Sequence, residues 1–276
     1  MQSFAGRRVI ITGGSSGIGL ATAVLAARHG AHVCLVARDR ARLEAAAQTV
    51  KATAAPGVRV VTQSLDLGDR EAIAAAAPAL LTVLGGLDVL VHSAGMTHVA
   101  ELQHTPDSAY EEVMRVNYLG VVWLTQRCLP HLMAQRSGHL AFVSSFLGLN
   151  GLYAYSAYAA SKHAVTGYAA SLRQDLLPWG VGVTCVFPGE TDTPMLRAER
   201  LIQPKVVTSL ADEAAVVSAE VVARALLGGI AARRFRVVPG RYNALMTWLS
   251  HHFPWLARLI IDRVVRRDGA VKPPPG

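Results

Sequence analysis

In Val9-Ile-Ile-Thr-Gly-Gly-Ser-Ser-Gly-Ile-Gly19, a short β-branched run leads into a glycine-rich turn, and Leu20 to His29 after it has a helical composition. The pattern predicts a buried strand, a tight turn and a helix that ends at Gly30. Glycines at such a turn let backbone N–H groups approach a pyrophosphate, and the amino terminus of the helix adds a favourable dipole. We therefore expect a dinucleotide to bind here.

The phosphate-binding residues are expected within this turn. They are Gly13, Ser15, Ser16, Gly17, Ile18 and Gly19. The turn lacks a terminal Gly-Lys-Ser/Thr, so it does not match a nucleoside-triphosphate loop. A purely tight turn is the alternative, but the position between a strand and a helix favours dinucleotide binding.

Two arginines follow the second predicted strand, which runs from Ala31 to Val36. A dinucleotide fold reads the adenosine ribose at this corner, and an acidic residue there would suit a free 2′-hydroxyl. Position 37 is alanine, and Arg38 and Arg42 offer positive partners for a 2′-phosphate. The sequence therefore predicts NADP(H) rather than NAD(H). A basic helix start on a solvated surface is the alternative for both arginines.

Asp66 and Leu67 end the third predicted strand, Arg59 to Leu65. Asp66 could accept a hydrogen bond from the adenine amine. It could equally cap the helix that begins near Asp69. Both readings remain open at the level of the sequence.

Small residues follow the fourth predicted strand, Leu87 to Val91. Ala94 and Gly95 would let a cofactor lie against the backbone. A long helix is predicted over Glu111 to Leu129 with Asn117 inside it. Its amide could bond the backbone and hold a water, or it could be an ordinary polar residue of the core; spacing does not decide.

Tyr158 and Lys162 are four residues apart in a predicted helix, so they share one helix face. A phenol has an ordinary pKa of about 10, and a lysine charge beside it favours the phenolate. Ser145 ends the apolar run Leu140 to Ser145, where a hydroxyl can meet both the tyrosine and a substrate carbonyl. A solvated pair on the helix surface is the alternative, and Ser145 argues against it.

A sixth apolar strand, Val181 to Phe187, precedes a sharp turn. Further cofactor contacts are expected there, at Pro188, Gly189, Thr191 and Thr193. A helix over Val216 to Ala232 and a strand over Phe235 to Val238 complete the pattern. Alternating strands and helices predict an α/β fold: a Rossmann-type, doubly wound, mostly parallel seven-stranded sheet with helices on both faces. All of the sites named fall on its carboxyl edge.

The chain is expected to divide unevenly. Residues 1–240 would form the catalytic NADP(H)-binding domain, with a substrate lid at about 195–210, followed by a C-terminal amphipathic segment over 241–267 and a flexible proline-rich tail over 268–276. Aromatic and aliphatic residues beside arginines in 242–267 suit an interfacial helix on an anionic membrane. Packing over the substrate pocket or against another subunit is the alternative.

Composition limits the partners. Of the 276 residues, 51% are hydrophobic, and the formal net charge is +8. The arginines are too scattered to indicate nucleic acid. Cys34, Cys128 and Cys185 show neither a disulfide framework nor metal-ligand spacing, which favours a reducing compartment. We expect no signal peptide or membrane span, and thus a cytoplasmic protein, peripheral on the inner face of the membrane if 242–267 binds lipid.

Together these residues resemble the pattern of the short-chain dehydrogenase/reductase superfamily. The matching residues, spread over 7 to about 240, are Thr12-Gly-x-x-x-Gly-Ile-Gly19, Asn117, Ser145, Tyr158-x-x-x-Lys162 and Pro188-Gly189. The resemblance implies that Tyr158 donates the proton in carbonyl reduction and that Lys162 lowers its pKa and holds the nicotinamide ribose. Ser145 would polarise the carbonyl, and Asn117 would order a relay water. One departure is His92-Ser93 where the superfamily often has Asn-Asn, which puts a sheet-bracing side chain in doubt.

A closer similarity is to the 3-ketodihydrosphingosine (3-dehydrosphinganine) reductases. The shared segments are Leu35-Val-Ala-Arg38, Ala94-Gly-Met96, Asn117-Tyr-Leu-Gly120, Phe142-Val-Ser-Ser145, Thr191-Asp-Thr-Pro194 and Val264-Val-Arg-Arg267. This similarity implies reduction of a lipid ketone by NADPH in sphingolipid synthesis, in a homo-oligomer (dimer or tetramer). Scarce lysine against abundant arginine and alanine favours a bacterial origin. The alternatives are another hydrophobic ketone, such as a steroid or β-ketoacyl thioester, and a non-catalytic NADP(H)-sensing protein.

Overall fold

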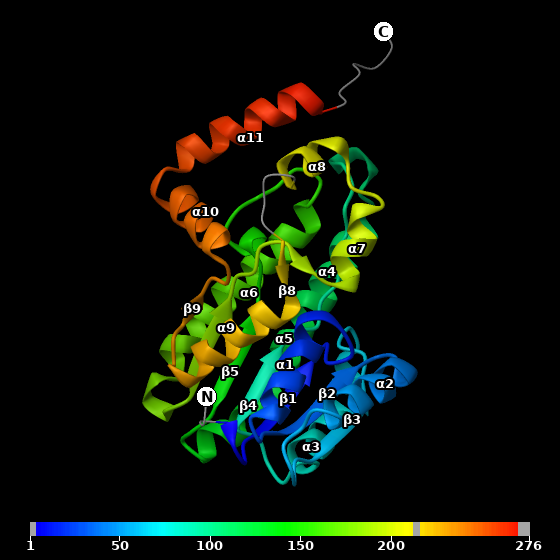
Figure 1. Ribbon diagram of the computed structural model, residues 1–276, viewed down its shortest axis with the longest axis vertical. Helices are drawn as coiled ribbons and strands as arrows, with labels where there is room; N and C mark the ends of the chain where they lie inside the picture. The colour runs from blue at the N-terminus through cyan, green and yellow to red at the C-terminus, as the bar shows by residue number, and fades with distance from the viewer. Residues whose placement is uncertain (1–3, 212–215, 270–276) are drawn as a thin grey trace.

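A sheet of seven parallel strands runs through the middle of the molecule (Figure 1). This computed structural model describes residues 4–211 and 216–269. In spatial order the strands are β3 (Val60–Ser64), β2 (His32–Ala37), β1 (Arg8–Thr12), β4 (Val89–His92), β5 (His139–Val143), β6 (Gly182–Val186) and β9 (Arg236–Val237). The strand order reverses between β1 and β4, where Val9 pairs with Val33 on one side and with Val89 on the other. The predicted doubly wound α/β fold is confirmed, and every pairing within this sheet is parallel.

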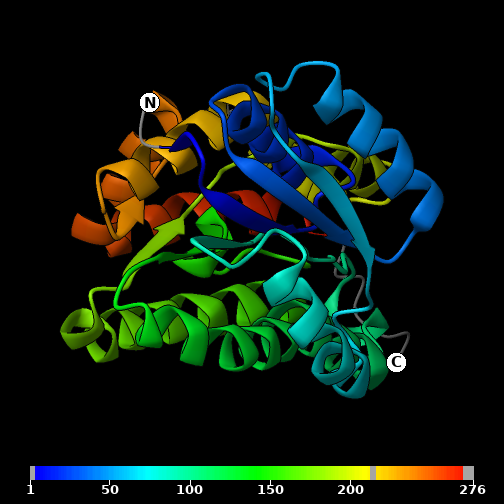
Figure 2. The same cartoon turned by 90° about the horizontal axis from the view of Figure 1, so that it is seen from below.

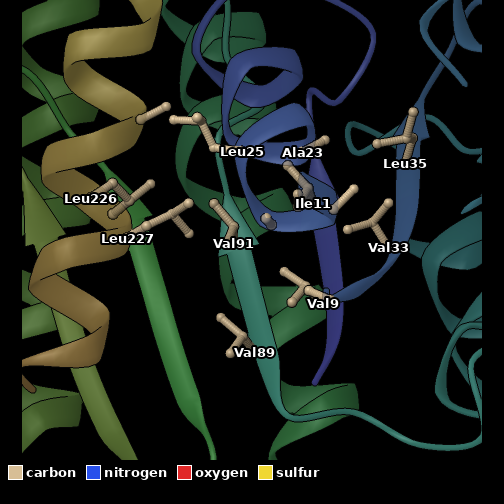
Figure 3. Packing of buried hydrophobic residues seen from close by; sticks show 14 of the residues in the cluster. Val9, Ile11, Ala23, Leu25, Val33, Leu35, Val89, Val91, Leu226 and Leu227 are labelled. Atoms are coloured by element: carbon tan, nitrogen blue, oxygen red, sulfur yellow. The ribbon is translucent and has the colours of Figure 1, made fainter. Parts of the chain in front are cut away.

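Two layers of helices cover the sheet, as Figure 2 shows from below. One face carries α1 (Gly17–Arg28), α2 (Arg40–Lys51) and α9 (Ala219–Ala231), and the other carries α3 (Arg70–Thr82), α5 (Gly120–Ala134) and α6 (Ser156–Asp175). Side chains alternate along each strand between two cores. Val9 and Ile11 pack into the first core with α1 and α9 (Figure 3). Ile10 packs into the second core. Burial of both faces explains why the strands read as continuous apolar runs.

The long helix predicted over Glu111 to Leu129 is longer and is not regular. It begins as α4 (Asp107–Met114), passes through a π-helical turn over Arg115–Leu119 and continues as α5. Gly120 at the end of this turn lies against the backbone carbonyl of Leu67, where a Cβ would collide. A π turn inside a helix disturbs the backbone hydrogen-bond ladder and is typical of functional sites. Propensity alone cannot predict such a turn.

The remaining elements lie beyond the carboxyl ends of the strands. They are β7 (Thr191–Asp192), α7 (Pro194–Arg200), α8 (Lys205–Ala211), β8 (Val217–Ser218), α10 (Arg241–His252), α11 (Pro254–Asp268) and 3₁₀ turns over Leu102–His104 and Phe146–Gly148. A further 3₁₀ turn, Leu177–Trp179, precedes β6 at the opposite edge of the sheet. The predicted lid is therefore a helical pair, α7 and α8, and α11 crosses over α8 (Figure 1). The first residues predicted as helix after position 215 instead form β8, which pairs with β7.

The C-terminal helices differ in how they are attached. Asn243 in α10 is buried and donates from Nδ2 to the carbonyl oxygen of Phe187 at 2.7 Å, so α10 is anchored to the end of β6. The last helix ends at Asp268, one residue beyond the predicted segment. Of the predicted tail, residues 270–276 lie outside the described residues. Across the two described ranges, none of the helices combines the length and apolar character that crossing a bilayer requires.

Candidate active site

The glycine-rich turn joins β1 to α1 at the carboxyl edge of the sheet. Gly13 has φ +67°, and a Cβ added there would lie 2.7 Å from the backbone nitrogen of Ala94. Gly17 also has a positive φ, +52°, and a Cβ on Gly19 would collide with the carbonyl oxygen of Gly13. Side chains are therefore excluded for two separate reasons, the left-handed backbone and the close approach of β4. The backbone at Gly13, Gly17 and Gly19 is therefore not covered by side chains of its own, and we call this turn the glycine cradle.

This cradle fits the phosphates of a dinucleotide. Ser16 is the N-cap residue of α1, is exposed and makes no side-chain bond to the first turn of the helix, so N–H groups there remain available. Ser15 is half-buried beside it, and Ile18 packs against the first core. The predicted turn residues are thus brought together, with Ile18 serving the core through its side chain.

Thr12 holds the two strand ends together, a role that the sequence analysis did not assign. Its Oγ1 accepts hydrogen bonds from the backbone N–H of Ser93 at 3.1 Å and of Ala94 at 3.2 Å, and donates to the carbonyl oxygen of Val91 at 3.3 Å. This fixes the backbone of Ala94 and Gly95 against the glycine turn. The signal in the sequence was a hydroxyl residue, Thr12, at the first position of the glycine-rich motif, directly after an apolar strand.

Arg38 and Asp66 line a cavity of about 540 Å³ at the ends of β2 and β3. The other lining residues are Ser64, Leu65, Ala72, Ala75 and Ala76. Asp69, not Asp66, caps α3, by accepting from the N–H of Ala72 at 2.8 Å. Asp66 instead accepts from the N–H of Gly68 at 2.8 Å. The capping alternative for Asp66 is therefore wrong, while Leu67 is buried in the second core and does not line this cavity.

Arg42 differs from Arg38 in its surroundings. It lies one turn into α2, outside the cavity lining, and its Nε is 3.5 Å from Oδ2 of Asp39 in an exposed ion pair. Asp39 also caps α2 by accepting from the backbone N–H of Arg42 at 3.0 Å. The guanidinium of Arg38 thus stays at the rim of the cavity, whereas that of Arg42 already has an acidic partner.

The amide of Asn117 is fully engaged within the protein. It is 1% exposed, accepts from the backbone N–H of Met96 at 2.8 Å, and donates to the carbonyl oxygen of Met96 at 2.9 Å and to Oγ of Ser161 at 2.9 Å. Because Met96 follows Gly95 directly, Asn117 fixes the loop after β4 to the helix that carries Tyr158. The amide therefore bonds the backbone, as the first alternative predicted, and its role in holding a relay water stays a prediction.

Lys162 is deeply buried, 5% exposed, and its Nζ donates to the carbonyl oxygen of Val143 at 2.9 Å. Burial lowers the pKa of this ammonium to about 8. Nζ lies 5.5 Å from the centroid of the Tyr158 ring, so its charge sits over the ring. Gly95 leaves room beside it, since a Cβ there would be 3.5 Å from Nζ and 3.3 Å from Oδ1 of Asn117. Backbone, amide and ammonium therefore converge on one point.

Tyr158 is half-buried on α6 beside Ser145, which follows β5. Burial first, and then the negative charge of Glu199, raise the pKa of the phenol, while a hydrogen bond with Ser145 opposes the rise. Lys162 is not among the groups that shift the pKa of this phenol, because its ammonium is bonded to the carbonyl oxygen of Val143 and faces the ring of Tyr158. Ser145 also accepts from the backbone N–H of Leu147 at 3.1 Å, which fixes its rotamer.

The turn after β6 links the cradle to the lid. The carbonyl oxygen of Pro188 accepts from the N–H of Phe146 at 2.7 Å, and Oγ1 of Thr191 donates to the carbonyl oxygen of Gly189 at 3.0 Å. Thr193 caps α7 through the N–H of Leu196 at 3.3 Å. Its Cγ2 would be 3.1 Å from a Cβ on Gly17, so the lid starts directly against the glycine turn.

His92, which stands where the superfamily often has asparagine, is buried in the core. His92 stacks on Phe142, with 5.1 Å between ring centroids, and its Nε2 is 2.9 Å from Oγ1 of Thr125 in α5. The imidazole therefore braces β4 against a helix. Burial lowers its pKa to about 3, so it is neutral at physiological pH.

The comparisons with known proteins agree with this geometry. A family model described as "short chain dehydrogenase" matches residues 7–203, more than half of the chain. The chain is 34% identical over 221 residues to a 3-dehydrosphinganine reductase of Danio rerio, covering 79% of this chain and 67% of the relative. It is 33% identical over 246 residues to the putative oxidoreductase SadH of Mycobacterium tuberculosis, covering 87% and 88% of the two chains.

Solved structures with the same architecture carry either nicotinamide cofactor. A short-chain dehydrogenase/reductase from Burkholderia phymatum in complex with NAD has a TM-score of 0.80, with 26% identity and all of both chains covered. L-Sorbose reductase from Gluconobacter frateurii, complexed with NADPH and L-sorbose, has a TM-score of 0.76, with 27% identity and 86% and 96% covered. The chain belongs to the short-chain dehydrogenase/reductase family and is an oxidoreductase of that family.

Proposed function

We propose that this chain is an NADPH-dependent carbonyl reductase that converts 3-ketodihydrosphingosine to dihydrosphingosine. The observation that carries the proposal is the convergence of the Tyr158 phenol, the Ser145 hydroxyl and the buried Lys162 ammonium beside the glycine cradle. Similarity to proteins named 3-dehydrosphinganine reductase supports the substrate. An apolar cluster of Val99, Tyr155 and Val207 at the lid supports a hydrophobic ketone.

The proposed chemistry assigns one task to each side chain. When bound, the nicotinamide supplies the hydride to the carbonyl carbon. Ser145 donates a hydrogen bond to the carbonyl oxygen, and Tyr158 transfers its proton to that oxygen. The buried Lys162 ammonium, 5.5 Å from the centre of the Tyr158 ring, contacts the ribose of the cofactor. Asn117 holds the loop after β4 against α6.

A panel of ketones tests the substrate. Purified protein should oxidise NADPH with the long-chain 3-ketosphingoid base, and more slowly with a steroid ketone or a β-ketoacyl thioester. Faster turnover of either of the latter would replace the substrate while keeping the chemistry. NADPH binding without turnover on any ketone would favour a non-catalytic sensor.

The choice of NADPH rests on Arg38 at the rim of the cavity. Arg38→Asp should weaken NADPH binding by about 10- to 100-fold and change NADH binding little, because it places a like charge beside the 2′-phosphate. Arg127→Asp, on the exposed surface of α5, is the control for net charge. Equal losses for the two cofactors would show that Arg38 only supports the loop.

We also propose that α11 contacts anionic lipid. Trp255 and Leu259 are 64% and 63% exposed in the first half of the helix, and Arg263 and Arg266 are exposed in the second half. Such an arrangement suits insertion of the apolar half and attraction of the basic half to headgroups. Flotation with vesicles should therefore require phosphatidylglycerol and be lost in Trp255→Ser/Leu259→Ser. A dimer that dissociates in this variant, without vesicle binding by either protein, would assign the face to a subunit contact.

A further inference from the structure

A carboxylate is buried under the lid close to Tyr158. Glu199 in α7 is 8% exposed and accepts a hydrogen bond from the Tyr155 hydroxyl at 2.8 Å. That hydroxyl in turn accepts from Nε2 of Gln203 at 2.7 Å. Both partners are neutral, and the sequence analysis singled out none of the three.

Glu199 has no positive partner in the protein. The arginines on the same helix are directed elsewhere: Arg197 pairs with Asp192 at 2.9 Å and Arg200 with Glu190 at 2.8 Å. Within residues 4–211 and 216–269, no lysine, arginine or histidine forms an ion pair with Glu199. Burial raises the pKa of the Glu199 carboxyl, and the hydrogen bonds from Tyr155 and Thr97 oppose the rise. A cation from outside the chain would stabilise the charged form, because a buried carboxylate without a counter-ion is costly.

The hydroxyls of Tyr155 and Thr97 both approach the carboxylate of Glu199 as donors, and neither carries a charge. Nε2 of Gln203 donates to the Tyr155 hydroxyl. No residue that the structure describes donates to the buried Oε1 of Gln203. The Tyr155 hydroxyl donates its one hydrogen to Glu199 and accepts from Gln203, so it has no second hydrogen to donate to Oε1 of Gln203. An acceptor-rich, negatively charged lining fits a ligand with several N–H donors and a positive charge.

Tyr155 and Glu199 lie beside Tyr158. The rings of Tyr155 and Tyr158 meet edge to face with 6.1 Å between centroids, and the charge of Glu199 is felt at the Tyr158 phenol. A carbonyl held by Tyr158 therefore places the adjacent carbon of the ligand on the side of Tyr155 and Glu199.

We propose that Glu199, with Gln203 beside it, recognises a protonated amino group on the carbon next to the ketone. The proposal rests on the proposed function, since it takes the ketone to be reduced at Tyr158. It assigns to the lid the selection of 2-amino ketones over plain hydrophobic ketones. Glu199 is a specificity residue in this account and takes no part in proton transfer.

The test compares two substrates in Glu199→Gln, which keeps the shape of the side chain and its bond from Tyr155. For the long-chain 2-amino-3-ketone, kcat/KM should fall by about 10- to 100-fold, mainly through KM, because a charge-assisted hydrogen bond is lost. For the ketone of equal length that lacks the amine, kcat/KM should stay within about twofold. Glu220→Gln, which removes an exposed acid paired with Arg224 in α9, is the matched control, and Glu199→Asp should recover part of the loss.

Equal losses on both ketones would overturn the inference and make Glu199 a support for the lid, and so would no loss on the amino ketone. Binding of the long-chain 2-amino-1,3-diol, measured against the same diol without the amine, provides a readout that needs no turnover. If the wild type reduces neither ketone, the proposed function fails, while amine-dependent binding that Glu199→Gln abolishes still supports the carboxylate as the amine site. Amine-independent binding would sink the inference whatever the activity.

Discussion

In β1, β2 and β4 almost every side chain is fully buried between two helical layers, whereas none of the fifteen residues of α11 is buried. The two regions also differ in their connections. The central strands are fixed by backbone pairing on both sides, while α11 contacts mainly α8 and α10. The sheet therefore sets where the cofactor and the reacting groups lie. We propose that α7, α8 and the C-terminal helices, which lie outside this doubly covered sheet, determine which molecule reaches the site.

The sharpest way to separate chemistry from framework is Tyr158→Phe. The phenol is at the edge of the sheet and only half-buried, so its removal should leave the melting temperature and NADPH binding nearly unchanged. We expect kcat to fall by about 10²- to 10⁴-fold, because the proton donor is lost. Rapid-mixing measurement of NADPH oxidation checks the result. A wild-type rate would remove Tyr158 from the mechanism.

The framework itself should break at Gly19→Ala. A methyl group there collides with the carbonyl oxygen of Gly13, which must move together with the turn. We expect a loss of about 2–3 kcal/mol in the free energy of unfolding, and weaker NADPH binding. Gly228→Ala in α9 is the matched control, since a Cβ there meets nothing within 4 Å. The control should stabilise by up to about 1 kcal/mol, because alanine favours helix. Similar denaturation midpoints for the two variants would contradict the close packing.

Acid should weaken the framework through two buried histidines. Burial is the main cause that lowers the pKa of both His92 and His139 to about 3, well below the usual value of about 6.5. Below pH 6.5 the two histidines are protonated in the unfolded chain but remain neutral in the folded chain. The free energy of unfolding therefore falls as pH falls towards 3. For the two groups together the loss between pH 6.5 and 5.5 is about 2 kcal/mol.

Urea unfolding across this pH range measures the effect. His92→Asn, which keeps a polar side chain beside Thr125, should remove about half of the slope. His251→Asn, at an exposed position in α10, should leave the slope unchanged. A flat profile in the wild type would mean that the core admits charged histidine.

The order of strands and helices could be predicted from the sequence because it depends on local features: β-branched runs, glycine turns and helix caps such as Asp69. The parallel sheet followed from the alternation of elements. The π turn around Asn117 could not be predicted, because it arises from tertiary contacts with Met96 and Ser161. The lengths of the short strands β7, β8 and β9 could not be predicted either, because they depend on which strand each one pairs with.

The site divides in a similar way. The spacing of Tyr158 and Lys162 along a helix placed them together, and the glycines marked the cradle. Glu199 carried no signal in the sequence, since it lies in an arginine-rich stretch that reads as solvated surface. Only the fold shows that its neighbours pair with other acids and that it faces inward. The different surroundings of Arg38 and Arg42 likewise depend on Asp39 capping α2.

Removal of α11 should have the smallest effect on the folded framework. A chain that ends at Phe253 keeps Asn243 on the carbonyl of Phe187, whereas one that ends at Gly240 would lose that anchor. We expect the shorter chain to lose at most about 1 kcal/mol in the free energy of unfolding and to bind NADPH within about twofold of the wild type, since α11 buries no residue fully. Flotation with phosphatidylglycerol vesicles should be lost. Trp255→Ser/Leu259→Ser, which retains the helix over α8, controls for newly exposed lid surface. A loss as large as that of Gly19→Ala would place α11 with the sheet in the core of the protein rather than with the lid on its surface.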